Sequence, residues 1–436
     1  ANNKLRIEDR AAHDWYRFVL SFPPHLVRDY LARFGVGANH VVLDPFCGTG
    51  TTLVECKKLA IPCVGLEANP MAWFASHVKV NWRIEPDELI ENSRRILRLA
   101  RQKLEQQGIE DGMSLPLFRS RRKRLTELRT LPAGQLELLL KNSISPLPLH
   151  KVLVLLETIQ GHASSGLDGH QRLALAKAIV FRVSNLHFGP EVGVKSPKED
   201  SPVLDIWLAN IMDMAEDLRV LGKLSDTPAT VHREDARQLS GALKPQSVSA
   251  VVTSPPYPNE KDYTRTTRLE SVLLGFLKDR KDLRALKQRL IRSNTRNVFC
   301  NDRDDDFIAN TPEIHRLAEA IERRRRQLGK TSGFERLYSR VAKLYFGGMA
   351  RHLGELRLVL KPGAQLAYVV GDQASYLRVM IRTGQILANL AETLGYQVMG
   401  IDLFRTRLAT ATKEQLREEV VLLRWPEKRT GGNGRR

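Results

Sequence analysis

The sequence predicts an α/β fold built on a doubly wound, mostly parallel sheet that carries helical insertions. Short apolar runs of strand length alternate with helix-like segments near both ends of the 436-residue chain. A glycine-rich turn joins the first of these runs to a helix, and the second run ends in an acid. This succession is typical of the first β-α-β unit of a doubly wound sheet.

The N-terminal elements follow one another closely. The first 35 residues are helix-like, and Pro23 and Pro24 suit the start of a helix. The sequence then predicts, in order, a strand at 41–44, a helix at 53–59, a strand at 62–66 and a helix that Asn69 and Pro70 open.

Two long insertions interrupt this alternation. Residues 86–229 show little strand signal, and helices are expected there at 87–107, 149–160, 171–184 and 203–220. Residues 258–345 are mostly helix-like and very basic. The catalytic α/β domain is therefore expected to comprise 1–85, 230–257 and 346–436, with 86–229 and 258–345 inserted into it.

Strand signals return in the second half of the chain. We expect strands at 247–253, 365–372, 397–403 and 419–423, and a helix at 384–394. The apolar segment 358–363 leads into the strand at 365–372. We expect the tail 431–436 to be disordered.

The composition is that of an ordinary globular protein with a large positive charge. Apolar residues make up 42% of the chain, and the formal net charge of +19 favours a polyanionic partner such as nucleic acid. The sequence has no 18-residue apolar run, signal-peptide layout or basic amphipathic anchor, so we expect a cytoplasmic protein without a membrane partner.

The cysteines indicate a reducing compartment and no metal. Cys47, Cys56, Cys63 and Cys300 have neither paired spacing nor a nearby histidine, so a zinc site is not expected. No other cluster of metal ligands is visible, so the sequence predicts no metal requirement.

The turn after the first predicted strand has the character of a cofactor site. Its residues are Asp44, Pro45, Phe46, Cys47, Gly48, Thr49 and Gly50, followed by Thr51 and Thr52. Glycines let the backbone approach a ligand closely at the carboxyl end of a strand. The turn lacks the third glycine of a dinucleotide site and the lysine of a nucleoside triphosphate site. Glu67, at the end of the next strand, can accept hydrogen bonds from both hydroxyls of a ribose.

A second motif closes the strand at 247–253. Ser254, Pro255, Pro256 and Tyr257 follow this strand, and the two prolines make the backbone rigid. Rigid acceptors suit an amino-group substrate, because hydrogen bonds from an aryl amine favour the pyramidal geometry in which its nitrogen is reactive. The Tyr257 ring can stack on a base rotated out of a duplex.

The two motifs together resemble those of the amino-methyltransferase family. Members carry a D/N/S-P-P-Y/F/W catalytic motif and an F-x-G-x-G cofactor motif, which 254–257 and 46–50 match. The segment 22–26 resembles the family segment that packs over the methionine part of the cofactor. Asp235 resembles the acid that contacts the adenine amino group. The resemblance covers about 1–85 and 230–436.

The resemblance implies S-adenosylmethionine as cofactor and a Rossmann-like methyltransferase fold with a seven-stranded sheet. It also implies that Ser254 and the Pro255 carbonyl hold the amine, that Tyr257 stacks on the flipped base, and that the methyl group passes directly to nitrogen. The implied cofactor-binding residues are Phe22, Pro23, His25, Asp44, Pro45, Phe46, Cys47, Gly48, Thr49, Gly50, Thr51, Thr52, Glu67, Ala68, Asn69, Asp235, Ala236 and Ser254.

Ser254 indicates which base is methylated. In the family, serine at this position is associated with N4 of cytosine and aspartate with N6 of adenine. We therefore expect a cytosine-N4 methyltransferase of double-stranded DNA, with adenine N6 as the alternative. Methylation of a ring carbon uses a cysteine of the catalytic motif, whereas Cys47 lies in the cofactor turn, where we interpret it as a small filler.

The sequence does not decide which insertion reads the DNA. The cofactor motif precedes the catalytic motif by about 200 residues, the reverse of many serine-type members. Residues 261–343 contain 21 Lys or Arg and 12 Asp or Glu, and 119–124 form a competing basic patch. Candidate DNA-binding residues are Arg265, Arg289, Arg292, Arg296, Arg323, Arg324, Lys195 and Lys198.

Two further segments are open to two interpretations. The polar loop 185–200 either closes over the DNA or is a plain surface loop. Tyr263, Thr264 and Arg265 either line the base pocket or begin an ordinary helix.

Other functions also remain open. An RNA amino-methyltransferase usually carries an RNA-binding module, which we do not find, and a non-catalytic DNA-binding subunit would not need both motifs. The protein is expected to serve a restriction-modification or epigenetic system. The sequence leaves open the target site, the oligomeric state and whether a cognate restriction endonuclease exists.

Overall fold

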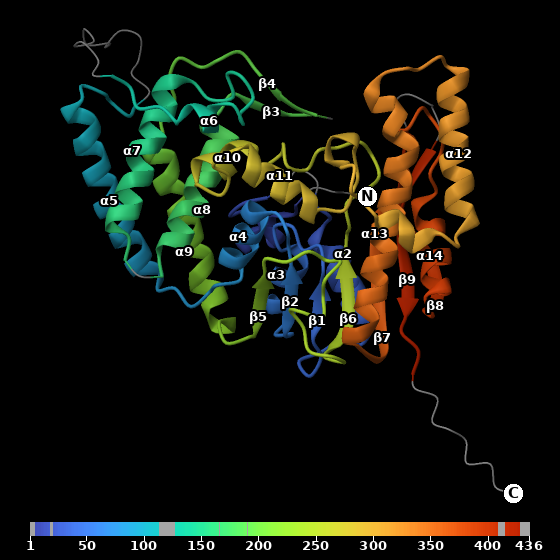
Figure 1. Cartoon of the computed structure of the whole chain (residues 1–436). Coiled ribbons are helices and arrows are strands. Elements are labelled where there is room, and N and C mark those ends of the chain that lie inside the picture. The colour runs from blue at the N-terminus through green and yellow to red at the C-terminus, as the bar shows by residue number, and fades with distance from the viewer. Residues whose placement is uncertain are drawn as a thin grey trace, which may run out of the picture.

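The computed structural model describes residues 5–17, 21–112, 127–164, 166–189, 191–408 and 415–427. Within these residues, a seven-stranded sheet has the order β5-β2-β1-β6-β7-β9-β8 (Figure 1). The strands are β1 (Val42–Asp44), β2 (Cys63–Leu66), β5 (Ala229–His232), β6 (Val248–Thr253), β7 (Leu360–Gly371), β8 (Gln397–Leu408) and β9 (Gln415–Arg424). β9 runs in the direction opposite to the other six strands of this sheet, which confirms the mostly parallel sheet.

The strand order reverses at β1. The chain passes from β1 outward through β2 to β5, and then returns to the other side of β1 to form β6 and β7. Connections that leave two neighbouring strands in opposite directions open a crevice at the carboxyl ends of those strands. The turn after β1 and the motif after β6 flank this crevice.

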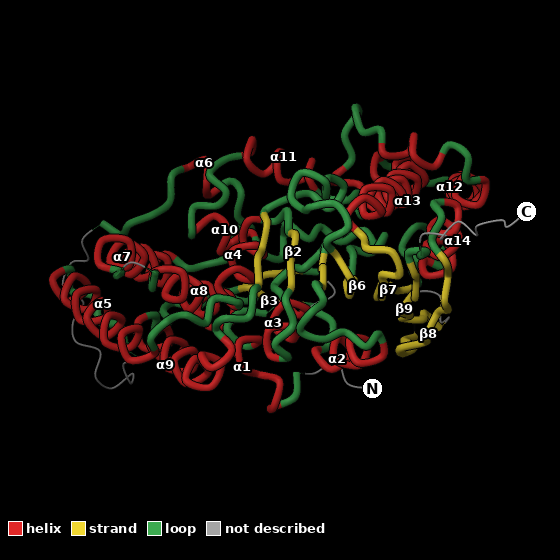
Figure 2. Tube along the Cα trace, turned by 90° about the horizontal axis from the view of Figure 1, so that it is seen from below, coloured by secondary structure: helices red, strands yellow, loops and turns green. Residues whose placement is uncertain are grey.

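The sheet separates two hydrophobic cores, because successive side chains of a strand point to opposite faces. Val42 and Val252 face a core shared with α2, α3 and α4. Leu43 and Val251 face a core shared with α13 and α14. Figure 2 shows α2 and α3 on one side of the strands and α13 on the other. These helices are α2 (Pro24–Arg33), α3 (Thr51–Lys58), α4 (Pro70–Lys79), α13 (Gly333–Val359) and α14 (Thr383–Thr393).

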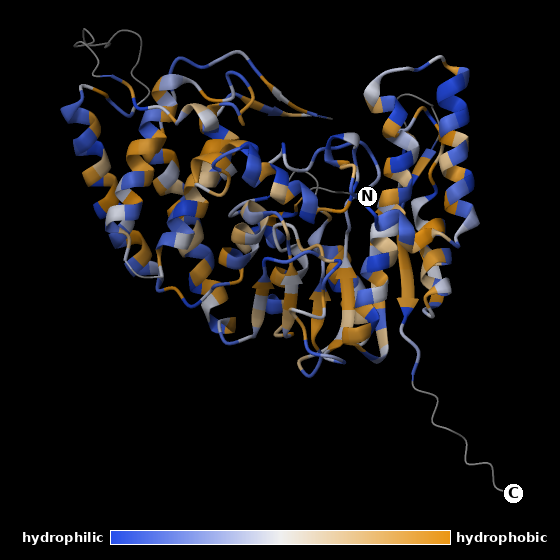
Figure 3. Cartoon of the chain, viewed as in Figure 1, coloured by the Kyte–Doolittle hydropathy of each residue, from blue (hydrophilic) through white to orange (hydrophobic). Residues whose placement is uncertain are grey.

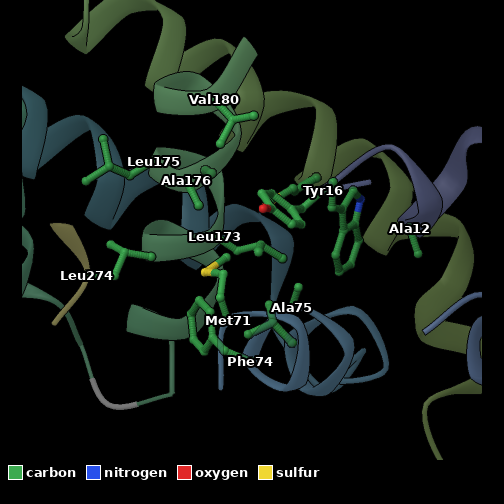
Figure 4. Close-up of a cluster of buried hydrophobic side chains, with 14 of the residues drawn as sticks. Ala12, Tyr16, Met71, Phe74, Ala75, Leu173, Leu175, Ala176, Val180 and Leu274 are labelled. Atoms are coloured by element: carbon green, nitrogen blue, oxygen red, sulfur yellow. The ribbon is translucent and has the colours of Figure 1, made fainter. Parts of the chain in front are cut away.

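The first insertion lies at the β5 end of the sheet (Figure 1). Its helices are α5 (Pro86–Gln106), α6 (Ala133–Leu136), α7 (Pro146–His162), α8 (Asp168–Ala178) and α9 (Leu204–Leu221). The four long helices confirm the four that the sequence predicted. Side chains of α4 and α8, among them Met71, Phe74 and Leu173, meet in one core (Figure 4). The helices of this stretch are therefore packed onto the α/β sheet domain rather than tethered to it.

The second stretch is also mostly helical. It holds α10 (Arg268–Leu273), α11 (Arg280–Arg289) and α12 (Pro312–Gln327). The long helix α13 begins within this stretch and continues across residue 345 to the start of β7. Its buried residues from Val341 onward pack against the sheet, so α13 joins the second stretch to the sheet.

Three segments differ from the sequence prediction. β3 (Leu186–Phe188) and β4 (Val192–Val194) pair in antiparallel fashion, where glycines and polar residues predicted a loop. β5 was not predicted, because only Val231 of this edge strand is buried and the apolar signal is short. The strand predicted at 365–372 begins earlier, because β7 starts at Leu360, directly after α13 ends at Val359.

The N-terminal region is only partly helical. A 3₁₀ turn at Ile7–Asp9 precedes α1 (Arg10–His13), and α2 begins at Pro24 with Pro23 as its cap, which confirms the predicted helix start. Predictions for 18–20, 119–124 and 431–436 fall outside the described residues.

Hydrophobic residues concentrate in the strands and inner helix faces, and hydrophilic residues cover outer helices such as α12 (Figure 3). None of the described helices combines the length and the apolar character needed to span a membrane.

Candidate active site

The turn after β1 adopts backbone conformations that favour glycine. Gly48 and Gly50 have φ angles of 51° and 86°. A Cβ atom on Gly50 would lie 3.0 Å from the Cβ atom of Ser76. Gly50 caps the N-terminus of α3, so the backbone of the turn faces the crevice between β1 and β6, where the strand order reverses.

Glu67 closes the cofactor turn from the end of β2. Its two carboxylate oxygens accept hydrogen bonds from the backbone N–H groups of Gly48 (2.9 Å) and Asn69 (2.7 Å). Burial raises the pKa of Glu67 to about 7, and the two backbone bonds only partly offset this effect. A ligand that donates further hydrogen bonds would favour the ionised carboxylate.

Asp44 links the cofactor turn to the end of β6. Its Oδ1 accepts hydrogen bonds from the Phe46 N–H (3.1 Å) and the Thr253 hydroxyl (2.6 Å). Burial raises the pKa of Asp44 to about 6. Within the described residues, Asp44 Oδ2 and the Thr49 hydroxyl are buried without a hydrogen-bond partner. Unsatisfied buried polar atoms beside a cavity are typical of a site built for a ligand.

The catalytic motif leaves β6 next to this turn. The Ser254 hydroxyl donates a hydrogen bond to the Val369 carbonyl of β7 (3.1 Å). The Tyr257 N–H donates to the hydroxyl of Tyr263 (3.2 Å). Burial raises the pKa of the Tyr257 phenol, so the ring is neutral at physiological pH. The motif is thus held from β7 and from its own loop.

One cavity of about 420 Å³ brings the two motifs together. This volume is within the range of small-molecule sites. Seventeen of the proposed cofactor and catalytic residues line it: Phe22, Pro23, Pro45, Phe46, Cys47, Gly48, Thr49, Thr51, Glu67, Ala68, Asn69, Asp235, Ala236, Ser254, Pro255, Pro256 and Tyr257.

The other four proposed residues, His25, Asp44, Gly50 and Thr52, lie behind the cavity wall. Thr52 donates its hydroxyl hydrogen to the Val252 carbonyl (3.1 Å), which fastens α3 to β6. The His25 ring lies 6.5 Å from that of Phe404, whose side chain lines the cavity. These residues shape the cavity without forming its surface.

Asp235 is fixed by an arginine. The Arg237 guanidinium binds both Asp235 oxygens, at 3.0 Å from Nε to Oδ1 and 2.6 Å from Nη2 to Oδ2, and also binds Asp304. His352 bonds to the Ala236 carbonyl (2.8 Å) and lies 4.9 Å from the Phe46 ring. Burial lowers the pKa of His352 to about 4, so this histidine is a neutral support.

Cys47 is buried beside Ser76, with 3.8 Å between Sγ and Oγ. Burial raises the pKa of this thiol well above its usual value, so the reactive thiolate is not formed at neutral pH. This environment suits a packing role.

The structure adds residues that the sequence did not single out. Phe181, in the π-helical turn Ile179–Val183 after α8, and Phe188 of β3 bring two aromatic rings from the first insertion to the cavity. Arg405 of β8 and Glu418 of β9 line it from the far side. π-Helical turns are frequent at functional sites, but this one has no clear sequence signal. Tyr263 also lines the cavity, whereas Thr264 is buried against Asp262.

The structure reassigns Arg292 from DNA binding to packing. Its guanidinium binds both carboxylate oxygens of Asp302 (2.6 and 2.8 Å) and the Lys287 carbonyl (3.0 Å). The residue is 3% exposed, so its charge is already neutralised inside the protein. We therefore do not retain it as a phosphate contact.

The other candidate DNA-binding residues differ in how free they are. Arg289 lines the cavity and pairs with Glu234 (2.9 Å), and Arg265 lies 3.8 Å from Glu191. Lys198 is exposed but donates to the Ser184 carbonyl (2.9 Å). Four candidates are exposed and have no ion pair within the described residues: Arg296, Arg323, Arg324 and Lys195.

Comparisons with known proteins agree with this site. A family model described as DNA methylase matches residues 4–73, which include the cofactor turn and Glu67. The chain is 25% identical to the type II methyltransferase M.BsoBI of Geobacillus stearothermophilus, over 96% of this chain and 85% of that protein. It is 23% identical to the type II methyltransferase M.AvaI of Nostoc sp., over 96% of this chain and 87% of that protein. A 69-residue segment is 36% identical to the type II methyltransferase M.MjaII of Methanocaldococcus jannaschii.

Proposed function

Because the chain is a DNA methyltransferase of the amino-methyltransferase family, we propose that it methylates N4 of cytosine in double-stranded DNA with S-adenosylmethionine as the methyl donor. The observation that carries the choice of base is Ser254. It occupies the first position of the catalytic motif and opens onto the same cavity as the cofactor turn. The resemblance associates serine at this position with cytosine.

The residues around the cavity fit the proposed cofactor. The unpartnered Thr49 hydroxyl, which lines the cavity, can bind a polar group, and Glu67 can accept hydrogen bonds from ribose hydroxyls. Phe22 and Phe46 supply apolar surface. S-adenosylmethionine, when bound, supplies a sulfonium methyl group that needs no further activation.

The catalytic motif is suited to bind an exocyclic amine. The Ser254 hydroxyl and the Pro255 carbonyl can accept the two N–H groups of the base, which frees the nitrogen lone pair from the ring. Tyr257 presents its ring to a base that has left the duplex. Pro255 and Pro256 keep these groups in place, because their backbone torsions are restricted.

The test is to incubate the protein with radiolabelled S-adenosylmethionine and unmethylated genomic DNA, digest the DNA, and identify the labelled nucleoside. We expect N4-methylcytosine. Tyr257→Ala should lower kcat/KM by about 10- to 100-fold, because it removes base stacking. Tyr257→Phe keeps the ring and should stay within a few-fold of wild type. Label in N6-methyladenine alone would replace the proposal with the adenine reaction, and the absence of label in DNA would exclude both.

We also propose that the enzyme serves a restriction-modification system with a cognate endonuclease. The support is its similarity to proteins named as type II methyltransferases. Plasmid DNA from cells that express the chain should resist an endonuclease that cuts at the methylated site. Full cleavage of fully methylated plasmid by every endonuclease of that specificity would argue against this role.

A further inference from the structure

Two charged residues, Glu418 and Arg405, lie near the catalytic motif on neighbouring strands of the sheet. In the pairing of β9 with its neighbours, Glu418 lies opposite Gly371 of β7 and opposite Arg405 of β8. Ser254 is bonded to the Val369 carbonyl, two residues before Gly371 on the same strand. Gly371 of β7, Glu418 of β9 and Arg405 of β8 therefore form one row at this edge of the sheet, two residues beyond the point on β7 that binds Ser254.

Gly371 lets Tyr257 and Glu418 approach each other. A Cβ atom on Gly371 would lie 3.2 Å from Cε2 of Tyr257 and 3.5 Å from Cγ of Glu418. Tyr257, Glu418 and Arg405 all line the reaction cavity. The charges of Glu418 and Arg405 both act on the pKa of the Tyr257 phenol, which places them within electrostatic range of the ring. The surface expected to hold the base thus includes an ion pair.

Glu418 orients Arg405 but uses only part of its hydrogen-bond donors. Its Nε and Nη2 bind the two carboxylate oxygens of Glu418 at 2.6 and 2.9 Å. Its Nη1 makes no hydrogen bond within the described residues, so the outer edge formed by Nη1 and Nη2 still carries N–H groups directed away from Glu418. The Arg405 side chain is 25% exposed, so water competes only weakly for these donors.

The free edge of Arg405 matches one of the two candidate bases. Beside its exocyclic amine, cytosine presents two neighbouring acceptors, the ring nitrogen N3 and the carbonyl oxygen O2. On the corresponding Watson–Crick edge, adenine presents one acceptor beside its amine, the ring nitrogen N1, and the C2–H group follows. A guanidinium edge with two parallel donors therefore pairs fully with cytosine and only partly with adenine, as in other bidentate contacts of arginine to a base.

We propose that Arg405, held by Glu418, recognises the N3 and O2 acceptors of the target cytosine while Tyr257 stacks on its ring. The inference rests on the proposed function and adds the residue that selects the base. Donation to N3 and O2 draws electrons from the ring and does not make the amine more nucleophilic. Arg405 is therefore a specificity residue, and Glu418 is a positioning residue that acts through it.

The test compares Arg405→Met with a matched control on the same sheet. Arg424→Met alters an arginine at the opposite end of β9 that pairs with Glu427 (2.5 Å). With unmethylated plasmid DNA, Arg405→Met should lower kcat/KM for DNA by about 10- to 100-fold and raise the share of label in N6-methyladenine. The dissociation constant for S-adenosylmethionine, measured by calorimetry, should change less than about twofold. The control should match wild type in all three measurements.

Two further variants keep the test decisive. Loss of cofactor binding in Arg405→Met would indicate that this variant does not fold. Arg405→Lys then replaces it, because lysine keeps the charge but offers no planar edge. Its kcat/KM should be about tenfold below wild type. Glu418→Gln should relax the choice of base without changing cofactor affinity.

The outcomes separate this inference from the proposed function. If the wild-type enzyme labels cytosine and both Arg405 variants keep its kinetics and its choice of base, the inference is overturned and the proposed function stands. Wild-type label in adenine alone overturns both, because the two-acceptor match is then irrelevant.

Discussion

The carboxyl group of Glu67 lies at the end of β2, where burial raises its pKa to about 7. Hydrogen bonds from ribose hydroxyls would favour the ionised form of this group. Below pH 7, cofactor binding must therefore expel a proton from Glu67, which costs about 1.4 kcal/mol for each pH unit.

We accordingly expect the affinity for S-adenosylmethionine to rise with pH up to about 7 and to level off above it. Glu67→Gln removes one titrating group, so its affinity should be lower and should depend less on pH. Calorimetric titrations at pH values between about 5.5 and 8 measure both effects. An identical pH profile in Glu67→Gln would contradict the role of Glu67.

At the scale of elements, a charged cluster joins three N-terminal segments. Glu55 of α3 bonds to the His13 ring of α1 (2.7 Å) and to Arg28 of α2. Burial lowers the pKa of His13 to about 4, so this contact is a hydrogen bond from a neutral ring at pH 7. Burial alone would raise the pKa of Glu55, but His13, Lys58 and Arg28 outweigh it and hold the pKa at about 2.

Glu55→Ala should lower the free energy of unfolding by roughly 2 to 4 kcal/mol at pH 7, less than for a fully buried pair because Arg28 is partly exposed. The stabilisation is complete above the usual glutamate pKa of about 4.5 and is lost as the pH falls toward the folded-state value of about 2. Urea unfolding at both ends of this range should show the difference shrink. Glu91→Ala, on an exposed position of α5, is the control and should have no such effect.

Over the molecule as a whole, the net charge of +19 can attract DNA only through cations that are not already paired with carboxylates. Arg296 is exposed and follows Thr295, which bonds to Glu260 of the loop that carries Tyr257. Arg292, four residues earlier, is buried with Asp302. Two arginines so close in sequence should therefore respond differently to removal.

Arg296→Ser should reduce the slope of log affinity for DNA against log salt by about 0.9 without changing Tm, since it removes one phosphate contact. Arg292→Met should lower Tm clearly, because it leaves Asp302 buried and unpaired, and should leave the slope unchanged. Binding isotherms at several salt concentrations and thermal unfolding measure both quantities. The reverse pattern would show that the two residues have exchanged roles.

Local signals in the sequence predict most of the sheet and the position of both motifs. The apolar runs before Asp44 and Ser254 predict strands, and the glycines between 44 and 50 predict the turn that lines the cavity. The long helices of the first insertion followed from helical periodicity. Only short elements with little buried surface, such as β5 and the β3–β4 pair, were not predicted.

Folding of the whole chain brings distant residues together at the cavity and sets which charges remain free. Arg405 and Glu418 reach Tyr257 through the pairing of β7, β9 and β8, and Phe181 and Phe188 reach the cavity through the packing of the first insertion. No spacing along the chain encodes these contacts, since they depend on strand order and helix packing between segments far apart in sequence. The burial of Arg292 has the same cause: the sequence shows a cation, and only its folded neighbours decide whether it faces DNA or Asp302.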